Sequence, residues 1–179
     1  SKVKNARQLP KAIKEAFLYD DKVILEKGLS AREIEIGVFG DPWSRDPKDP
    51  LRLQASMVGE IIPKAEFYTY ESKYLDPNGA ELKIPADIPP QASKKVREFA
   101  LLAFRALDCY GMARADFLMD KKTGAVYFNE LNTIPGFTPA SMYPLLWKAA
   151  GMDTPELLAG LIQLALRRHK THSKLKTAP

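Results

Sequence analysis

Charged and amide side chains are concentrated on two short, otherwise apolar segments of this 179-residue chain. The first segment contains Arg114 and Asp116, and the second contains Glu130 and Asn132. Burying such groups costs free energy unless something binds them. Hard divalent cations prefer oxygen ligands, and phosphates pair well with guanidinium groups. The pattern therefore predicts a site for a divalent cation that carries phosphates.

The alternation of residue types predicts that these side chains share one face of a β-hairpin. The odd-numbered residues around Arg114 and Asp116 are all apolar, so the two charged side chains point to the same side of a strand. A returning strand is expected over 125–132, and within it Glu130 and Asn132 also share a face.

The register of the hairpin depends on where its turn is centred. With a turn over 120–124 centred near Lys122, we expect Arg114 opposite Glu130 and Asp116 diagonal to Glu130. A shift of one residue would turn one pair to the other face. A surface hairpin with cross-strand ion pairs is the alternative interpretation of the same pattern.

The surrounding periodicity predicts the elements that must position the hairpin. Apolar residues at helical spacing predict helices over 9–17, 91–107, 141–150 and 155–166. Alternating or continuous apolar runs predict strands over 22–26, 33–39, 55–62 and 67–70. Prolines and an Asn-Gly pair predict loops over 40–50 and 76–90. This order favours an α+β fold with a largely antiparallel sheet and helices packed on one face.

Two local signals refine this set of elements. Thr154 is expected to cap the last helix, with Pro155 at its first helical position. Glu33 and Glu35 alternate with apolar residues on a strand, which by pattern alone is typical of a solvated face.

Composition places the chain among ordinary soluble globular proteins with one sizeable core. No apolar run approaches the roughly 20 residues of a membrane span, and no signal-peptide pattern is present. The single cysteine, Cys109, excludes an internal disulfide framework and suits a reducing compartment, so a cytoplasmic protein is expected. Much of the net charge of +5 lies in the segment 167–176. Without interleaved aromatic residues this segment favours a solvated tail, and neither nucleic acid nor membrane is expected as a partner.

The segments 111–117 and 128–136 resemble the C-terminal half of the ATP-grasp ligases, and more narrowly the D-alanine–D-alanine ligase family. The most specific parts of the resemblance are the runs 70–74 and 135–142. It extends over nearly the whole chain, to about Leu166. The implied fold is the C-terminal portion of the ATP-grasp fold.

The resemblance also implies a division of the chain. Residues 1–29 would end the central ATP-binding subdomain, 30–167 would form the C-terminal subdomain, and 168–179 would be a basic flexible tail. The family's glycine-rich phosphate loop and N-terminal domain would precede Ser1. We therefore expect a piece of a longer protein, without ligase turnover on its own.

On the hairpin, the resemblance implies specific roles. Asp116, Glu130 and Asn132 would coordinate two Mg²⁺ ions, with Mn²⁺ as an alternative, that bridge the phosphates of ATP. Arg114 would lie beside the transferred γ-phosphoryl group, and the backbone N–H of Gly136 would be a second oxyanion donor. Such donors match what phosphoryl and acyl transfer require.

The segment 22–33 resembles the adenine hinge of the family. There one carboxylate accepts from the adenine amino group, two residues give backbone contacts, and a second carboxylate holds the ribose hydroxyls. By the resemblance these roles fall on Glu26, on Lys27 and Leu29, and on Glu33. Gly28 departs from the family pattern, so adenine packing is expected to depend more on Phe67.

Residues 70–74 resemble the mobile loop that closes over the site in this family. Lys73 would contact the γ-phosphate or the substrate carboxylate, and Tyr74 would close over the second D-alanine. Tyr74 favours the amine of D-alanine over D-lactate as the nucleophile. Ser141 and Met142 fall where the family binds the carboxylate of the second D-alanine, at an expected helix start.

The implied activity is the ATP-dependent joining of two D-alanine molecules for peptidoglycan precursor synthesis. ATP phosphorylates the carboxylate of the first D-alanine, and the amine of the second attacks this acyl phosphate and expels phosphate. The family also suggests a homodimer. The alternatives are another ATP-grasp carboxylate–amine ligase and a non-catalytic nucleotide-binding fragment.

Overall fold

The computed structural model describes residues 1–63 and 80–176, in two compact units, Ser1–Ser30 and Ala31–Pro179. The smaller unit contains the short 3-10 helix η1 (Ala6–Gln8) and α1 (Leu9–Ala16), which begins with a proline in its first turn as predicted. The predicted strand over 22–26 is wrong, because these residues form no β-ladder with any described segment. An apolar run becomes a strand only where a neighbour supplies the backbone hydrogen bonds.

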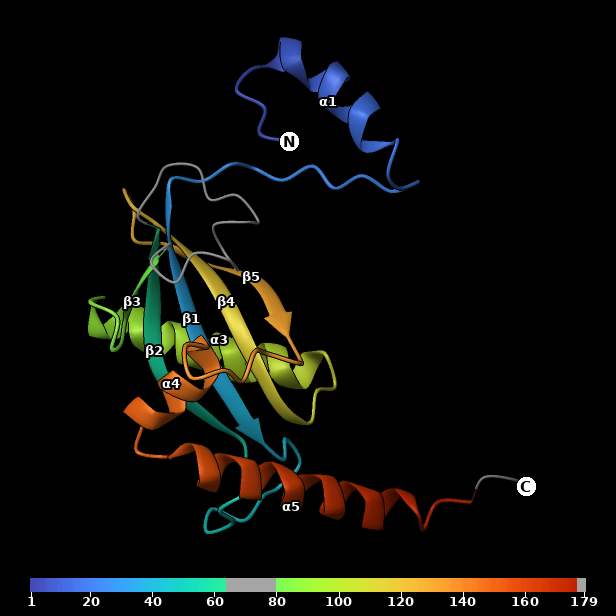
Figure 1. Cartoon of the computed structure of the whole chain (residues 1–179), viewed down its shortest axis with the longest axis vertical. Helices are drawn as coiled ribbons and strands as arrows, with labels where there is room; N and C mark the ends of the chain where they lie inside the picture. The colour runs from blue at the N-terminus through green and yellow to red at the C-terminus, as the bar shows by residue number, and fades with distance from the viewer. Residues whose placement is uncertain (64–79, 177–179) are drawn as a thin grey trace. The chain divides into compact units, whose positions relative to one another are not determined.

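The larger unit is built on one antiparallel sheet with the strand order β3-β2-β1-β4-β5 (Figure 1). Its strands are β1 (Ala31–Gly40), β2 (Gln54–Pro63), β3 (Ala80–Lys83), β4 (Gly111–Asp120) and β5 (Val126–Asn132). The predicted strands over 33–39 and 55–62 and the predicted hairpin are confirmed. The short edge strand β3 lies in the predicted loop over 76–90, and the predicted strand over 67–70 lies outside the described residues.

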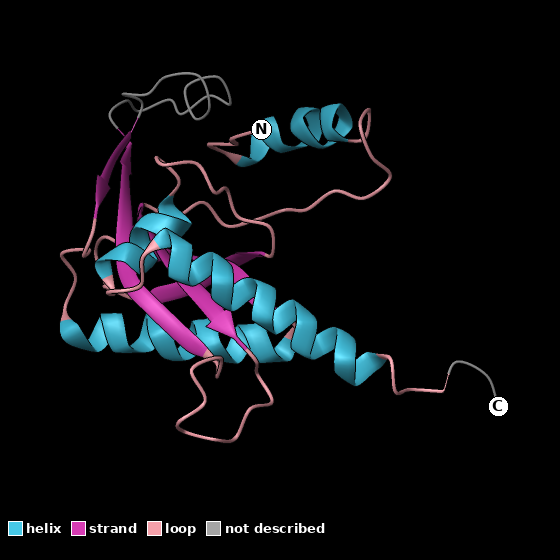
Figure 2. Ribbon diagram, turned by 60° about the horizontal axis from the view of Figure 1, so that its bottom comes forward, coloured by secondary structure: helices cyan, strands magenta, loops and turns pink. Residues whose placement is uncertain are grey.

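Helices cover both faces of the sheet (Figures 1 and 2). One face packs on α3 (Pro90–Ala106), and the other packs on α4 (Met142–Ala149) and α5 (Thr154–His172). The α+β class and the antiparallel sheet are as predicted, but the placement of all helices on one face is wrong. The reason lies in β1, whose Ile36 and Val38 face α3 while Phe39 packs on the α4 and α5 side. A strand that is buried on both sides needs a cover on both.

Two glycines let α4 lie directly on the backbone of the sheet. A Cβ atom at Gly37 of β1 would lie 2.7 Å from Nε1 of Trp147, and one at Gly59 of β2 would lie 2.7 Å from Cδ2 of Leu146. Both distances are shorter than side chains tolerate. The missing side chains therefore set how closely α4 approaches β1 and β2.

The start and the end of α5 differ from the prediction. Asp153 caps the helix by accepting a hydrogen bond of 2.8 Å from the backbone N–H of Glu156, so the predicted cap at Thr154 is wrong. The helix continues to His172, into the segment expected to be a flexible tail. Arg167 stabilises this extension through two hydrogen bonds to Asp49, of 2.6 and 3.0 Å.

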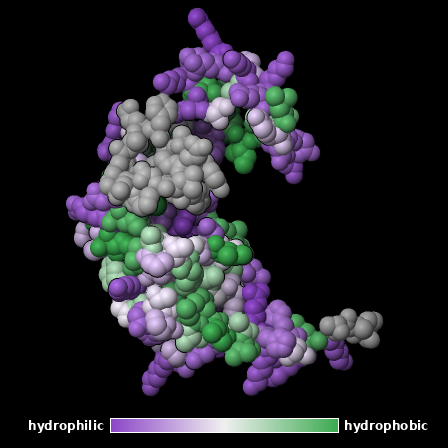
Figure 3. Space-filling view, viewed as in Figure 1, coloured by the Kyte–Doolittle hydropathy of each residue, from purple (hydrophilic) through white to green (hydrophobic). Residues whose placement is uncertain are grey.

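Within residues 1–63 and 80–176, no helix combines the length and the apolar character that crossing a bilayer requires. On the visible face of the larger unit, hydrophobic and hydrophilic residues are interspersed (Figure 3).

Candidate active site

The β4–β5 hairpin brings the predicted site residues together, but in a different register from the one predicted. Asp116 lies directly opposite Glu130, and Arg114 lies opposite Asn132. The predicted pairing of Arg114 with Glu130 is wrong. The four side chains nevertheless leave the sheet on the same face, because both pairs are directly opposed.

A β-bulge at Asn129 accounts for the register. Phe117 pairs with Phe128 and Asp116 pairs with Glu130, so Asn129 is an extra residue on β5. Without the bulge, the pairing near the turn would place Glu130 on the same face as Phe117, against α3. The bulge therefore returns Glu130 to the face that carries Asp116.

Arg114 and Asp116 form a bidentate ion pair on this face. Nε of Arg114 donates to Oδ1 of Asp116 at 2.8 Å, and Nη2 donates to Oδ2 at 2.7 Å. The side chains are only 17% and 14% exposed. The hydrogen bonds with Asp116, helped by the charges of Glu35 and Glu130, raise the pKa of Arg114 above its ordinary value. The guanidinium of Arg114 is therefore positively charged at neutral pH.

Glu35 is a member of this group that the sequence pattern assigned to a solvated face. Its side chain is 7% exposed, and Oε2 lies 3.1 Å from Nε of Arg114. On β1, Glu35 pairs with Asp116 of β4 and with Gly59 of β2, so it lies at the centre of the sheet. Glu33, two residues earlier, is exposed. Both glutamates share the face of Phe39, whose burial indicates a cover there, and Glu35 is the nearer of the two to Phe39 along the strand.

The segment between β5 and α4 forms a closed turn beside the hairpin. The Ser141 hydroxyl accepts from the backbone N–H of Thr138 at 3.0 Å, and the Ser141 N–H donates to the Thr138 carbonyl at 2.9 Å. A Cβ atom at Gly136 would lie 2.8 Å from Oγ of Ser141. Glycine at 136 is therefore required for this close approach.

Ser141 and Met142 lie at the start of α4, as predicted. The Met142 side chain is 5% exposed, and its terminal methyl group would meet a Cβ atom at Gly59. Met142 can therefore contribute only its backbone N–H to a ligand, whereas Ser141, whose N–H is bonded to the Thr138 carbonyl, can offer its hydroxyl.

Six other predicted site residues lie in the smaller unit or outside the described residues. Glu26, Lys27 and Leu29 belong to the smaller unit and are exposed or half-exposed in an extended segment. Phe67, Lys73 and Tyr74 lie outside the described residues.

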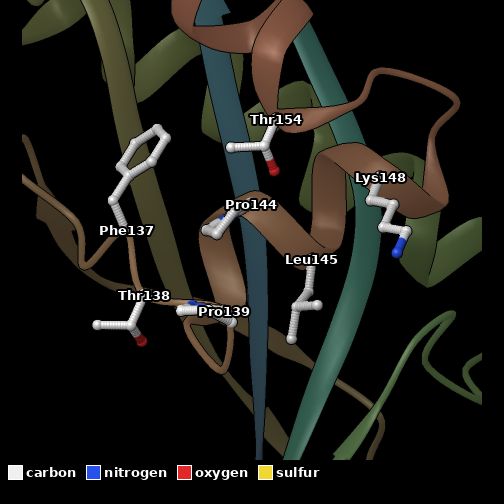
Figure 4. Close-up of a pocket in the computed structure, with 7 residues that line it drawn as sticks. All are labelled: Phe137, Thr138, Pro139, Pro144, Leu145, Lys148 and Thr154. Carbon is white, nitrogen blue, oxygen red and sulfur yellow. The ribbon is translucent and has the colours of Figure 1, made fainter.

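Two cavities adjoin the larger unit's helices, but Arg114, Asp116 and Glu130 line neither. The first, of about 240 Å³, lies between the turn before α4 and the helix itself (Figure 4). Its lining is largely apolar and comprises Phe137, Thr138, Pro139, Pro144, Leu145, Lys148 and Thr154. On the face of the sheet that carries Asp116, Glu130 is exposed, whereas Glu35, Arg114 and Asp116 are largely buried.

The oxygen donors on the hairpin fit a hard divalent cation. Asp116 and Glu130 are neighbours in the register, and Asn132 follows on the same face. Among the described residues, no three Asp, Glu, His or Cys side chains are grouped as a complete metal site. The hairpin supplies two carboxylates and one carboxamide, which leaves coordination positions for phosphate oxygens or water.

Comparison with known proteins assigns the chain to a family. The family model described as "D-ala D-ala ligase C-terminus" matches residues 1–163. A D-alanine–D-alanine ligase of Treponema denticola is 48% identical over 98% of this chain and 45% of its own length. The chain thus spans less than half the length of this relative.

Solved structures agree with this match. The D-alanine–D-alanine ligase of Coxiella burnetii superposes with a TM-score of 0.79 at 37% identity, over 97% of this chain and 43% of that one. The VanG D-Ala:D-Ser ligase of Enterococcus faecalis gives a TM-score of 0.71 at 31% identity, over 89% of this chain and 43% of that one. The chain therefore belongs to the family of the D-alanine–D-alanine ligase C-terminal region.

Proposed function

We propose that this chain is the C-terminal portion of an ATP-dependent D-alanine–D-alanine ligase that serves peptidoglycan precursor synthesis. The observation that carries the proposal is the face shared by Arg114, Asp116, Glu130 and Asn132, in a chain of this family. Hard oxygen donors beside a guanidinium are the groups that a phosphoryl transfer needs.

In the proposed reaction, a carboxylate oxygen of the first D-alanine attacks the γ-phosphorus of ATP and ADP leaves. The amine nitrogen of the second D-alanine then attacks the carbonyl carbon of the acyl phosphate. Orthophosphate departs with the electrons of the broken C–O bond, and the amine loses a proton. The product is D-alanyl-D-alanine.

Arg114 and Gly136 are proposed to stabilise the negative charge that develops in both steps. Arg114 would donate to the oxygens of the transferred phosphoryl group, and the N–H of Gly136 would donate to the carbonyl oxygen as it becomes an oxyanion. The hydroxyl of Ser141 and the N–H of Met142, at the N-terminus of α4, would bind the carboxylate of the second substrate.

Asp116, Glu130 and Asn132 are proposed to hold Mg²⁺, in one or two ions, with Mn²⁺ as an alternative. When bound, Mg²⁺ neutralises charge on the phosphates of ATP. Both oxygens of Asp116 accept from Arg114 in this structure, so Asp116 must release at least one of these hydrogen bonds.

The nucleotide contacts remain predictions. Glu26, Lys27, Leu29 and Glu33 would bind the adenosine, and Phe67 would pack on the adenine. Lys73 and Tyr74 would close over the phosphate and the second substrate. We also expect a cytoplasmic homodimer, which size-exclusion chromatography with light scattering on the natural protein would test.

The proposal is tested by phosphate release and mass spectrometry on the natural protein that carries this sequence. D-alanine, D-serine, D-lactate and L-alanine are supplied separately and in pairs with ATP. We expect D-alanyl-D-alanine as the main product. D-alanyl-D-serine as the main product would favour the second substrate named for the Enterococcus structure, and phosphate release with L-alanine alone would contradict the proposal.

The isolated 179-residue chain provides a second test. Because it spans 45% of the Treponema relative, we expect it to form no dipeptide by itself. Dipeptide formation by this chain alone would show that the remaining half of such a ligase is dispensable.

A further inference from the structure

We propose that Glu35 is a positioning residue, which keeps Arg114 in place when Asp116 turns to a divalent cation. This inference rests on the proposed function, because it gives Asp116 the role of a metal ligand. It adds a residue of β1 to the proposed cation-binding group, which otherwise comes from the hairpin.

The contact between Glu35 and Arg114 is close and sheltered. Oε2 of Glu35 lies 3.1 Å from Nε of Arg114, and the two side chains are 7% and 17% exposed. A buried carboxylate beside a buried guanidinium is held in one arrangement more firmly than a surface pair, because water competes little for either group.

Arg114 and the proposed cation compete for the carboxylate oxygens of Asp116. Arg114 donates to both of them, at 2.8 and 2.7 Å. A carboxylate that binds a cation offers the same lone pairs to the metal. Binding of the cation therefore removes from Arg114 the partner that accepts its hydrogen bonds.

Glu35 is the described ion-pair partner that Arg114 retains in that event. The position of Glu35 does not depend on Asp116, because Glu35 is anchored by backbone pairing in the central strand β1. Glu35 then holds the Nε side of the guanidinium, which leaves the Nη groups to face phosphoryl oxygens. Outer partners of this kind orient the groups that touch ligand.

Equilibrium binding of Mn²⁺ tests the proposal without requiring turnover. The natural protein, with a non-hydrolysable ATP analogue present, is titrated with Mn²⁺ and followed by electron paramagnetic resonance. Glu35→Gln leaves Asp116 as the ion-pair partner of Arg114 among the described residues, so Arg114 competes better with the cation. We expect the dissociation constant for Mn²⁺ to rise about 10- to 100-fold, the usual range for an outer partner.

Glu60→Gln is the matched control. Glu60 is also a buried carboxylate of the sheet that is paired with an arginine, Arg32, at 2.6 Å. It pairs with Ile34 in the register and so lies on the α3 face, away from the hairpin residues. We expect Glu60→Gln to change the dissociation constant for Mn²⁺ by less than about twofold.

A double-mutant cycle separates positioning from simple loss of negative charge. If Glu35 acts through Arg114, then Glu35→Gln changes Mn²⁺ binding by less than about twofold in an Arg114→Ala background. An equal weakening in both backgrounds, or no weakening in either, would overturn the proposal. If Glu35→Gln does not fold, Glu35→Asp is judged by the same two criteria, because it withdraws the carboxylate from Nε and keeps the charge.

Kinetics on the same variants distinguish this proposal from the proposed function. We expect Glu35→Gln to lower kcat about 10- to 100-fold and to leave the KM for D-alanine within twofold. Absence of any dipeptide product in the unmodified protein would refute the ligase function. Normal turnover with an unchanged kcat in Glu35→Gln would refute only the role of Glu35.

Discussion

Asp116 and Glu130 lie directly opposite each other across the β4–β5 hairpin, because one extra residue, Asn129, is accommodated between Glu130 and the turn. The bulge is thus the feature that gives the two carboxylates a common face. Bulges occur often beside active sites, where they redirect a side chain.

Single-residue deletions test this description of the hairpin. Deleting Asn129 leaves a regular ladder, with Phe128 opposite Phe117 and Glu130 still opposite Asp116. Deleting Phe128 instead places Asn129 opposite Phe117 and removes a ring contact with centroids 5.6 Å apart. We expect the second deletion to lower the free energy of unfolding by about 1 kcal/mol more than the first, as measured by urea unfolding. Equal losses would contradict the pairing of Phe117 with Phe128.

Neutralising Asp116 should weaken cation binding. Asp116→Asn removes the charge of one proposed ligand, and we expect the affinity for Mg²⁺ to fall at least tenfold in calorimetric titrations with nucleotide present. Asp120→Asn is the control, since Asp120 ends the same strand and accepts hydrogen bonds from Lys122 and Thr123 in the turn. Similar losses of affinity in both variants would argue against a metal site at Asp116.

Adding a methyl group at Gly136 should disturb the turn before α4. The new Cβ atom would lie 2.8 Å from Oγ of Ser141, which is itself fixed by Thr138. We expect Gly136→Ala to lower the free energy of unfolding by about 1–3 kcal/mol, the range for overpacking.

A Ser141→Ala background provides the control for the expected clash in Gly136→Ala. Cβ of Ser141 lies 3.6 Å from the new methyl group, an ordinary contact, so removal of Oγ relieves the clash. In a Ser141→Ala background we therefore expect Gly136→Ala to cost less than about 1 kcal/mol in thermal unfolding. An undiminished cost would place the strain elsewhere in the turn.

The ion pair between Asp49 and Arg167 should make the free energy of unfolding depend on pH in the acidic range. Hydrogen bonds from Arg167 hold the pKa of Asp49 well below its ordinary value. The unfolded chain then takes up the proton first, so the stabilisation is complete above the unfolded pKa of about 3.9 and is lost as the pH falls toward the folded pKa. We expect Asp49→Asn to lower the free energy of unfolding by about 1–3 kcal/mol at pH 7, and by progressively less between pH 4 and pH 2.

Asp46→Asn is the comparison for that measurement, because Asp46 lies in the same loop, is exposed and accepts from the backbone of Lys48. Urea unfolding of both variants at several pH values provides the data. A cost for Asp49→Asn that stays constant down to pH 2 would contradict the linkage to Asp49.

Sequence periodicity was sufficient to locate the hairpin and the shared face of Arg114 and Asp116, because the side chains of β4 alternate without interruption. It did not give the cross-strand partners. Those depend on the centre of the turn and on a bulge at Asn129, and neither leaves a periodic signal in the sequence.

The burial of charged side chains was the second feature that the sequence did not predict. Glu33 and Glu35 look equivalent in the sequence, yet only Glu35 lies beside Arg114 and under the cover that α4 and α5 give to this face. The difference comes from helices far along the chain. The N-terminal cap of α5 could not be predicted from residue type either. Asp153 and Thr154 are both residue types that cap helices, and Asp153 caps this one because its backbone is extended at the N-cap position.

Gly37 and Gly59 let the α4 side chains Trp147 and Leu146 pack directly on the main chain of β1 and β2. The distance between α4 and these two strands is therefore set by the α4 side chains, because glycine adds no side chain of its own at either position of the sheet. Any side chain at either glycine would push α4, and with it Ser141 at its start, away from the sheet that carries Asp116 and Glu130.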